Sequence, residues 1–172
     1  MTGWAHPRIP APDAAKDDWL ALSIEAQESL ERRRQFYGVL TARGATSDEL
    51  ASAKAEGAAW AEIARDWHWI ATGEGQHADA DSLAARIDAI DAAIGRFFQL
   101  IDQQGQATRA QNAQIARLAS LRWWAEREAN LPFQKQARWL ASVGHHWRAE
   151  NGHPTLGAMI ASRTDEKERK AA

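Results

Sequence analysis

The sequence predicts an all-α protein of five to six helices, arranged as an antiparallel bundle or a long helical hairpin with a coiled-coil-like seam. The first reason is composition, because the 172 residues include 37 alanines but only two valines. Alanine is the strongest helix former, whereas strands favour β-branched residues. The second reason is spacing, since apolar residues recur at three- and four-residue intervals along most of the chain. Such a length suits one domain with its own hydrophobic core.

The N-terminal region divides into an arm and a first helix. Residues 1–12 hold three of the five prolines, which predicts an extended arm that Trp4 attaches to the body. The first helix is expected over residues 13–41. Arg33 falls on its apolar face, where it either extends to solvent or pairs with a carboxylate of a neighbouring helix. That apolar face is formed by six residues: Trp19, Leu22, Ala26, Leu30, Tyr37 and Leu40.

A second helix is expected over residues 47–72. Thr46 and Glu49 have the spacing of a capping box at its start, and Gly73 is expected to end it. The glycine at position 57 faces the same side as large tryptophans and predicts a close helix crossing. The expected buried face has eight members: Leu50, Ala53, Gly57, Trp60, Ile63, Ala64, Trp67 and Ile70.

The clearest pattern is a seam of six apolar residues at alternating four- and three-residue spacing: Leu83, Ile87, Ile90, Ile94, Phe97 and Ile101. So narrow a stripe is typical of coiled coils, and it indicates either a long hairpin or pairing with a helix of another chain. Ile115 and Leu118 continue the same register beyond the polar residues 102–114. Either one helix of roughly fifty residues runs through this stretch, or Gly105 marks a turn. We favour the continuous helix.

The C-terminal region contains two further predicted helices. Pro132 interrupts the chain, and a helix is expected over residues 132–150. Its expected core side is formed by Phe133, Ala137, Leu140, Gly144 and Trp147. Thr155 can cap a short last helix, which contains Leu156, Met159 and Ile160.

Charge is distributed unevenly along the chain. Residues 1–102 carry 10 Lys/Arg and 17 Asp/Glu, a net charge of −7, whereas residues 103–172 carry 11 and 6, a net charge of +5. We therefore expect a single helical domain over residues 13–160, with an acidic part (13–102) and a basic, Trp-rich part (103–160), followed by a polar tail (161–172). This asymmetry indicates either an anionic partner or two halves that complement each other within a bundle or dimer. We favour the complementary halves.

Seven residues form a candidate binding surface: Arg117, Trp123, Trp124, Arg127, Lys135, Arg138 and His145. On a helical wheel they project away from the apolar faces of their helices. Tryptophan and arginine are common anchors of protein interfaces. Cations interleaved with aromatic rings can also hold phosphates and stack bases, as in proteins that bind single-stranded nucleic acids. A protein partner is the favoured interpretation, and a nucleic acid is the alternative.

Signatures of catalysis and metal binding are weak. The chain has no cysteine, which excludes disulfides and thiolate ligands, and the common phosphate-binding and hydrolase motifs are absent from it. Glu74 with His77, and Glu150 with His153, have the Glu-x-x-His spacing of di-iron bundles, but each pair straddles a glycine at an expected helix end. This spacing keeps a metal-dependent helical-bundle enzyme as a third alternative. We predict a non-enzymatic protein without a metal or cofactor.

The N-terminus lacks the pattern of a signal peptide, and no apolar run approaches the ~18 residues of a transmembrane helix. We therefore expect a cytoplasmic protein that does not associate with membranes. The leading interpretation is an oligomeric interaction or structural protein, which pairs helices through the Leu83–Ile101 seam and engages a partner with exposed Trp and Arg side chains. The alternative is a nucleic-acid-binding accessory protein that uses the basic face of residues 109–153.

Overall fold

The computed structural model describes residues 14–77 and 82–171, which form six α-helices and short 3-10 segments without any strand. This confirms the all-α prediction. The predicted arm over residues 1–12, with Trp4, lies outside the described residues. The elements in chain order are η1 (Ala14–Asp17), α1 (Trp19–Ala42), α2 (Ser47–Thr72), α3 (Leu83–Gln104), α4 (Arg109–Asn130), η3 (Phe133–Lys135), α5 (Ala137–Glu150) and α6 (Leu156–Ala171).

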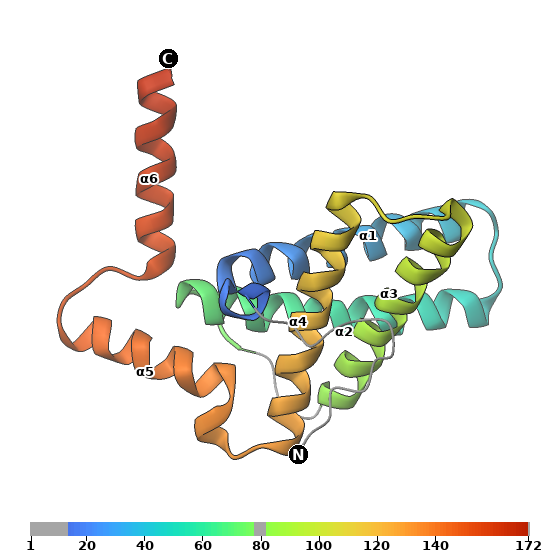
Figure 1. The fold of residues 1–172 in the computed structure, drawn as a ribbon. Helices are drawn as coiled ribbons and strands as arrows, with labels where there is room; N and C mark the ends of the chain where they lie inside the picture. The colour runs from blue at the N-terminus through green and yellow to red at the C-terminus, as the bar shows by residue number, and fades with distance from the viewer. Residues whose placement is uncertain (1–13, 78–81, 172) are drawn as a thin grey trace.

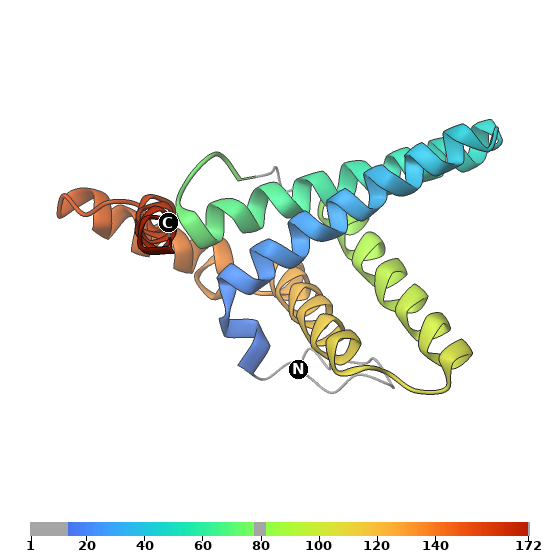
Figure 2. The ribbon, with the colours of Figure 1, turned by 90° about the horizontal axis from the view of Figure 1, so that it is seen from above.

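Helices α1 and α2 form a long antiparallel hairpin and lie side by side in both views (Figures 1 and 2). The predicted capping box is present, since the backbone N–H of Glu49 donates to the Thr46 hydroxyl and the Glu49 side chain accepts from the Thr46 N–H. Gly73 ends α2 in the left-handed conformation, with a φ of 77°. Both ends of α2 therefore agree with the sequence prediction.

Helices α3 and α4 form a second pair on one side of this hairpin (Figure 2). The predicted continuous helix through residues 102–114 is wrong. Gly105 has a φ of 79° and caps α3, and Thr108 with Gln111 forms a second capping box that starts α4. The two local signals together outweigh the heptad register that continues across them, because a left-handed glycine followed by a capping box stabilises a helix end and a new helix start.

The core lies where the two pairs cross. Its largest fully buried apolar side chains are Leu22, Trp60, Ile90, Ile94, Leu118 and Leu121. Ile90 and Ile94 are the centre of the predicted seam, and the other four members of the seam pack half-buried against the same core. The seam residues therefore pack against other helices of the same chain.

The first hairpin differs from the sequence prediction in three details. The first helix is divided, because η1 precedes α1 and the carboxylate of Asp18 caps α1 by accepting from the N–H of Ala21 at 3.0 Å. Tyr37 is exposed, so it does not join the buried face of α1. A Cβ atom at Gly57 would meet no atom within 4 Å, so the predicted close crossing at this glycine is wrong.

Arg33 pairs with a neighbouring helix, which was one of the two predicted outcomes. Its Nε donates to Glu56 on α2 at 2.6 Å, and Arg96 of α3 binds the same carboxylate. Burial lowers the pKa of the Arg33 guanidinium, and the charge of Glu56 opposes this shift. Glu56 therefore joins three helices through one carboxylate.

Helices α5 and α6 extend from one end of the two pairs (Figure 1). The predicted helix over residues 132–150 is interrupted, since η3 precedes α5. The hydroxyl of Thr155 accepts from the N–H of Ala158 at 3.1 Å and caps α6, as predicted. Residues 161–171 continue α6, and residues 161–170 of this stretch are exposed, so the polar tail is helical along most of its length. None of the helices in the described ranges is both long and apolar enough to cross a membrane.

Candidate functional site

Exposed apolar side chains gather on the outer face of α5 and on η3, the segment that precedes it. Four large apolar side chains lie exposed there, and we call them the α5 stripe: Phe133, Leu140, Val143 and Trp147, which are 54%, 41%, 50% and 55% exposed. The side of α5 that faces the body is formed instead by Ala137, Arg138 and Ala141, all of them buried. The sequence pattern predicted Ala137 in the core, which is confirmed. It also placed Phe133, Leu140, Gly144 and Trp147 in the core and Arg138 outside, and that part of the prediction is wrong.

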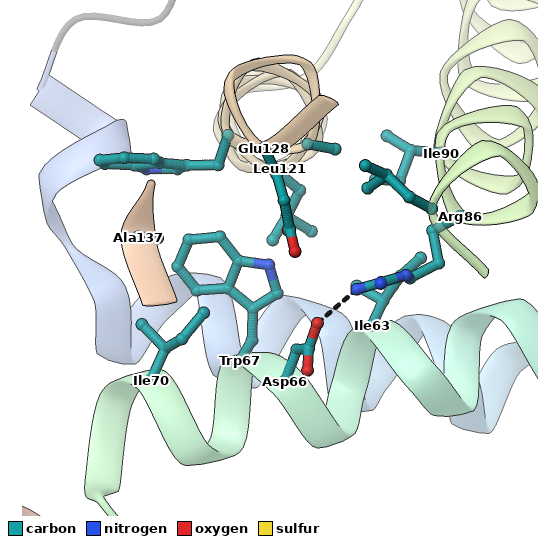
Figure 3. Close-up of a pocket in the computed structure, with 12 residues that line it drawn as sticks. Ile63, Asp66, Trp67, Ile70, Arg86, Ile90, Leu121, Glu128 and Ala137 are labelled. Atoms are coloured by element: carbon teal, nitrogen blue, oxygen red, sulfur yellow. Dashed lines mark hydrogen bonds and ion pairs between the residues drawn. The ribbon is translucent and has the colours of Figure 1, made fainter. Parts of the chain in front are cut away.

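The reason for this orientation is a buried cluster of charges. Arg138 of α5 binds Asp66 of α2, and Arg86 of α3 binds the same Asp66 oxygen (Figure 3 shows the Arg86–Asp66 pair). The exposed fractions of Asp66 and Arg86 are 3% each, and that of Arg138 is 9%. A buried charge without a partner destabilises a fold by several kcal/mol, so Arg138 must face inward to neutralise this cluster. The apolar stripe on the opposite side of α5 is thereby turned to solvent.

Glu128 of α4 completes the cluster. Its Oε1 lies 3.0 Å from Nε of Arg138, and its carboxyl group points into the same pocket as Asp66 and Arg86 (Figure 3). Burial raises the pKa of the Glu128 carboxyl, while the charges of Arg138 and Arg86 oppose this shift. Helices α2, α3, α4 and α5 thus meet at four charged side chains, two acidic and two basic.

The cavity beside this cluster is small. It has a volume of about 20 Å³ and is lined by Asp66, Arg86 and Glu128 together with apolar side chains such as Trp67 and Leu121. Such a volume accommodates about one water molecule. The arrangement therefore stabilises the crossing of four helices and lacks the room for an organic substrate.

A second contact holds the C-terminal half of α5. His145 lies against the end of α2, where its Nε2 is 3.0 Å from the backbone oxygen of Trp69 and its ring meets the Trp69 ring edge-on at 5.2 Å. A Cβ atom at Gly73 would approach Nδ1 of His145 to 3.0 Å. His145, predicted as an outward binding residue, is therefore half-buried against the body.

The remaining predicted binding residues lie mostly in contacts within the chain. Nε of Arg117 donates at 3.1 Å to Glu25, a fully buried carboxylate that also accepts from Gln114 at 2.8 Å. Nε1 of Trp124 donates to the backbone oxygen of Lys16 at 2.9 Å, and the Trp124 side chain is 8% exposed. These contacts fix α4 against α1 and η1, so the predicted outward projection of Arg117 and Trp124 is wrong.

Trp123, Arg127 and Lys135 are more accessible. The guanidinium carbon of Arg127 lies 4.2 Å from the centre of the Trp123 ring, and both residues are half-buried. Lys135 is exposed on η3, next to the α5 stripe. The seven predicted residues therefore do not form one surface. Lys135 is the one exposed residue among them, and the other six are buried or half-buried.

The two Glu-x-x-His pairs do not share a helical face. Glu74 and His77 follow the end of α2, and His153 follows the end of α5, whose last residue is Glu150. Glu74 accepts a hydrogen bond from the Thr155 hydroxyl at 3.0 Å and so holds the start of α6. Among the described residues, no group of three or more acidic or histidine side chains is placed to bind a metal ion.

Sequence reasoning identified Trp147, Leu140 and Phe133 as an apolar set but placed them in the core. The charge cluster decides the orientation of α5, and its members stand at positions 66, 86, 128 and 138, so they leave no local pattern in the sequence.

Comparison with known proteins returns no match: no family profile, no curated protein and no solved structure is significantly similar to the chain.

Proposed function

We propose that this protein is a non-enzymatic helical interaction protein, and that the α5 stripe binds an amphipathic helix of a protein partner. The observation that carries the proposal is the exposure of Leu140, Val143 and Trp147 on one face of the well-anchored helix α5, with Phe133 exposed on the preceding η3. Contiguous exposed apolar side chains mark interaction sites more often than isolated ones do. An exposed tryptophan such as Trp147 is a frequent anchor of binding energy.

The shape of the stripe favours a helix as the bound element. The 14 residues of α5 span about 21 Å, and Leu140, Val143 and Trp147 follow one another at three- and four-residue spacing. A second amphipathic helix laid along α5 would cover these three side chains, as in helix pairs elsewhere. Polar side chains such as Lys135 on η3 and Glu150 at the end of α5 lie exposed near the stripe and would form its rim.

The nucleic-acid alternative has less support. Arg117 and Arg138 are already paired with carboxylates, and Trp124 is buried, so three residues of the proposed basic face are used within the chain. Phosphate binding depends on cations that are free to replace counterions.

Photo-cross-linking in the native cell tests the proposal. A photoreactive phenylalanine analogue replaces Val143 on the stripe or Ala149, an exposed residue outside the stripe on the same helix. We expect a defined cross-linked species from position 143 and none from position 149. Equal yields at both positions, or none at either, would contradict a binding function of the stripe.

A further inference from the structure

Resting on the proposed function, we propose that the partner of the α5 stripe is a second copy of this chain, bound through an antiparallel α5–α5 contact about a twofold axis. A twofold interface presents the same patch on both copies, so the patch must be complementary to itself. The α5 stripe meets this requirement in the order of its side chains and in the charges at its ends.

The order of side chains along α5 is self-complementary. If the twofold axis passes between Val143 and Gly144, then Leu140 of one copy faces Trp147 of the other, and Val143 faces Gly144. A Cβ atom at Gly144 would meet nothing within 4 Å in the monomer, so the backbone there is open to close approach. Trp147 is held on one side by the stacked ring of His153, at 5.2 Å, which leaves its outer part for the second copy.

The charges at the two ends of the stripe also match in this arrangement. Lys135 stands on η3, just before α5, and has no ion pair among the described residues, and Glu150 is the last residue of α5, where its contact is an exposed one to His146 at 3.0 Å. An antiparallel pair brings the start of α5 in each copy, next to Lys135, near the end of α5 in the other, within about two residues of Glu150. A parallel pair would place like charges together, which destabilises an interface.

The contact is small, so the dimer is expected to be weak. One 14-residue helix from each copy provides less area than a stable interface of about 800 Å² on each partner. A dissociation constant on the order of 10 µM suits such a contact, and dimer and monomer would then exchange over ordinary laboratory concentrations. Sedimentation velocity of the full chain from about 1 to 200 µM measures this directly.

Three single variants and one double variant test the geometry. Trp147→Ala removes two side chains from a twofold interface, and we expect it to weaken dimerisation at least about 30-fold. Lys135→Glu or Glu150→Lys alone places like charges side by side, and each is expected to weaken it roughly five-fold. The double variant restores opposite charges in the antiparallel pair and should return the dissociation constant to that of the wild type. All three residues affected are exposed in the monomer, and circular dichroism checks that each variant is folded.

Chemical cross-linking at an introduced cysteine supplies the second measurement. The introduced cysteine is the one reactive thiol, because the chain has no cysteine of its own. Val143→Cys should be joined to itself by a short bismaleimide in the purified protein, whereas Ala149→Cys should not. A chain that stays monomeric at 200 µM, or charge reversals that the double variant does not rescue, overturns the dimer. If Val143 is then cross-linked in cells to a different protein, the proposed function stands; if it is cross-linked to nothing, both fail.

Discussion

Arg138 on α5 and Asp66 on α2 form a buried ion pair between residues that are 72 positions apart in the sequence. This pair, with Arg86 on the same carboxylate, determines which side of α5 faces the body. The apolar face of α5 is consequently exposed, although its pattern is that of a core helix. Because desolvated charges must be paired, electrostatics overrides the hydrophobic pattern of this one helix.

Removal of Arg138 should destabilise the protein strongly. Arg138→Ala leaves Asp66 with Arg86 alone and removes the partner of Glu128, so we expect the free energy of unfolding to fall by about 3 kcal/mol. Urea unfolding measures this change. Lys135→Ala is the control, because Lys135 is exposed, and it should change stability by less than about 0.5 kcal/mol. Similar small effects of both variants would show that the charge cluster does not hold α5.

Glu128 should make stability depend on pH in a predictable direction. Burial raises the pKa of its carboxyl above the ordinary value of 4.5, so the folded state binds the proton more tightly than the unfolded state does. The stability that results is present below pH 4.5 and is lost as the pH rises through the raised pKa. Glu128→Gln cannot titrate at this position. The wild type should therefore lose stability relative to Glu128→Gln as the pH rises above about 4.5 in urea unfolding. A wild type that gains stability relative to the variant would contradict the raised pKa.

Alanine substitution at two glycines should change the stability of the fold in opposite directions. Gly57 lies within α2 with open space around its Cβ position, so Gly57→Ala should stabilise the fold by about 1 kcal/mol through helix propensity. Gly73 has a φ of 77° and lies against His145, so Gly73→Ala should destabilise the fold by about 1 to 2 kcal/mol. Thermal unfolding compares the two. Destabilisation by Gly57→Ala would mean that a close helix crossing exists there after all.

Alanine substitution should destabilise the fold strongly at one tryptophan and only slightly at another. Trp124 is 8% exposed and donates a hydrogen bond to Lys16, so Trp124→Ala should cost about 3 to 5 kcal/mol. Trp147 is 55% exposed, and Trp147→Ala should change the stability of the monomer by less than about 1 kcal/mol. Chemical unfolding at low protein concentration separates these effects from self-association. The opposite ranking would place Trp147 in the core, as the sequence pattern alone predicts.

Much of the fold follows from local signals in the sequence. Thr46 with Glu49 and the glycine at 73 determine both ends of α2, and the apolar spacing of α3 identifies Ile90 and Ile94 as core residues. The heptad register continues across Gly105 into α4 and favours a continuous helix, but the left-handed Gly105 and the capping box of Thr108 with Gln111 separate the two helices. Local chemistry decided the turn, and periodicity did not.

The candidate site could not be predicted in the same way. The orientation of α5 depends on carboxylates at positions 66 and 128, which only the tertiary fold brings to Arg138. Likewise, Arg117 was placed outside because its partner Glu25 is 92 residues away in the sequence. A single sequence shows which residues are charged, but it does not show which charges are paired.

The orientation of α5 is the basis of the proposed function, and thiol labelling tests it most directly. Single cysteines are placed in the cysteine-free chain at Val143, which is 50% exposed, and at Ala141, which is 3% exposed, and their reaction with a soluble maleimide is timed at about 1 µM protein, where the monomer predominates. We predict that the cysteine at 143 reacts at the rate of a free thiol, and that the cysteine at 141 reacts at least about 100-fold more slowly, because it must wait for local unfolding. A faster reaction at 141 than at 143 would show that α5 packs with its apolar face inward, and it would contradict the proposed interaction surface.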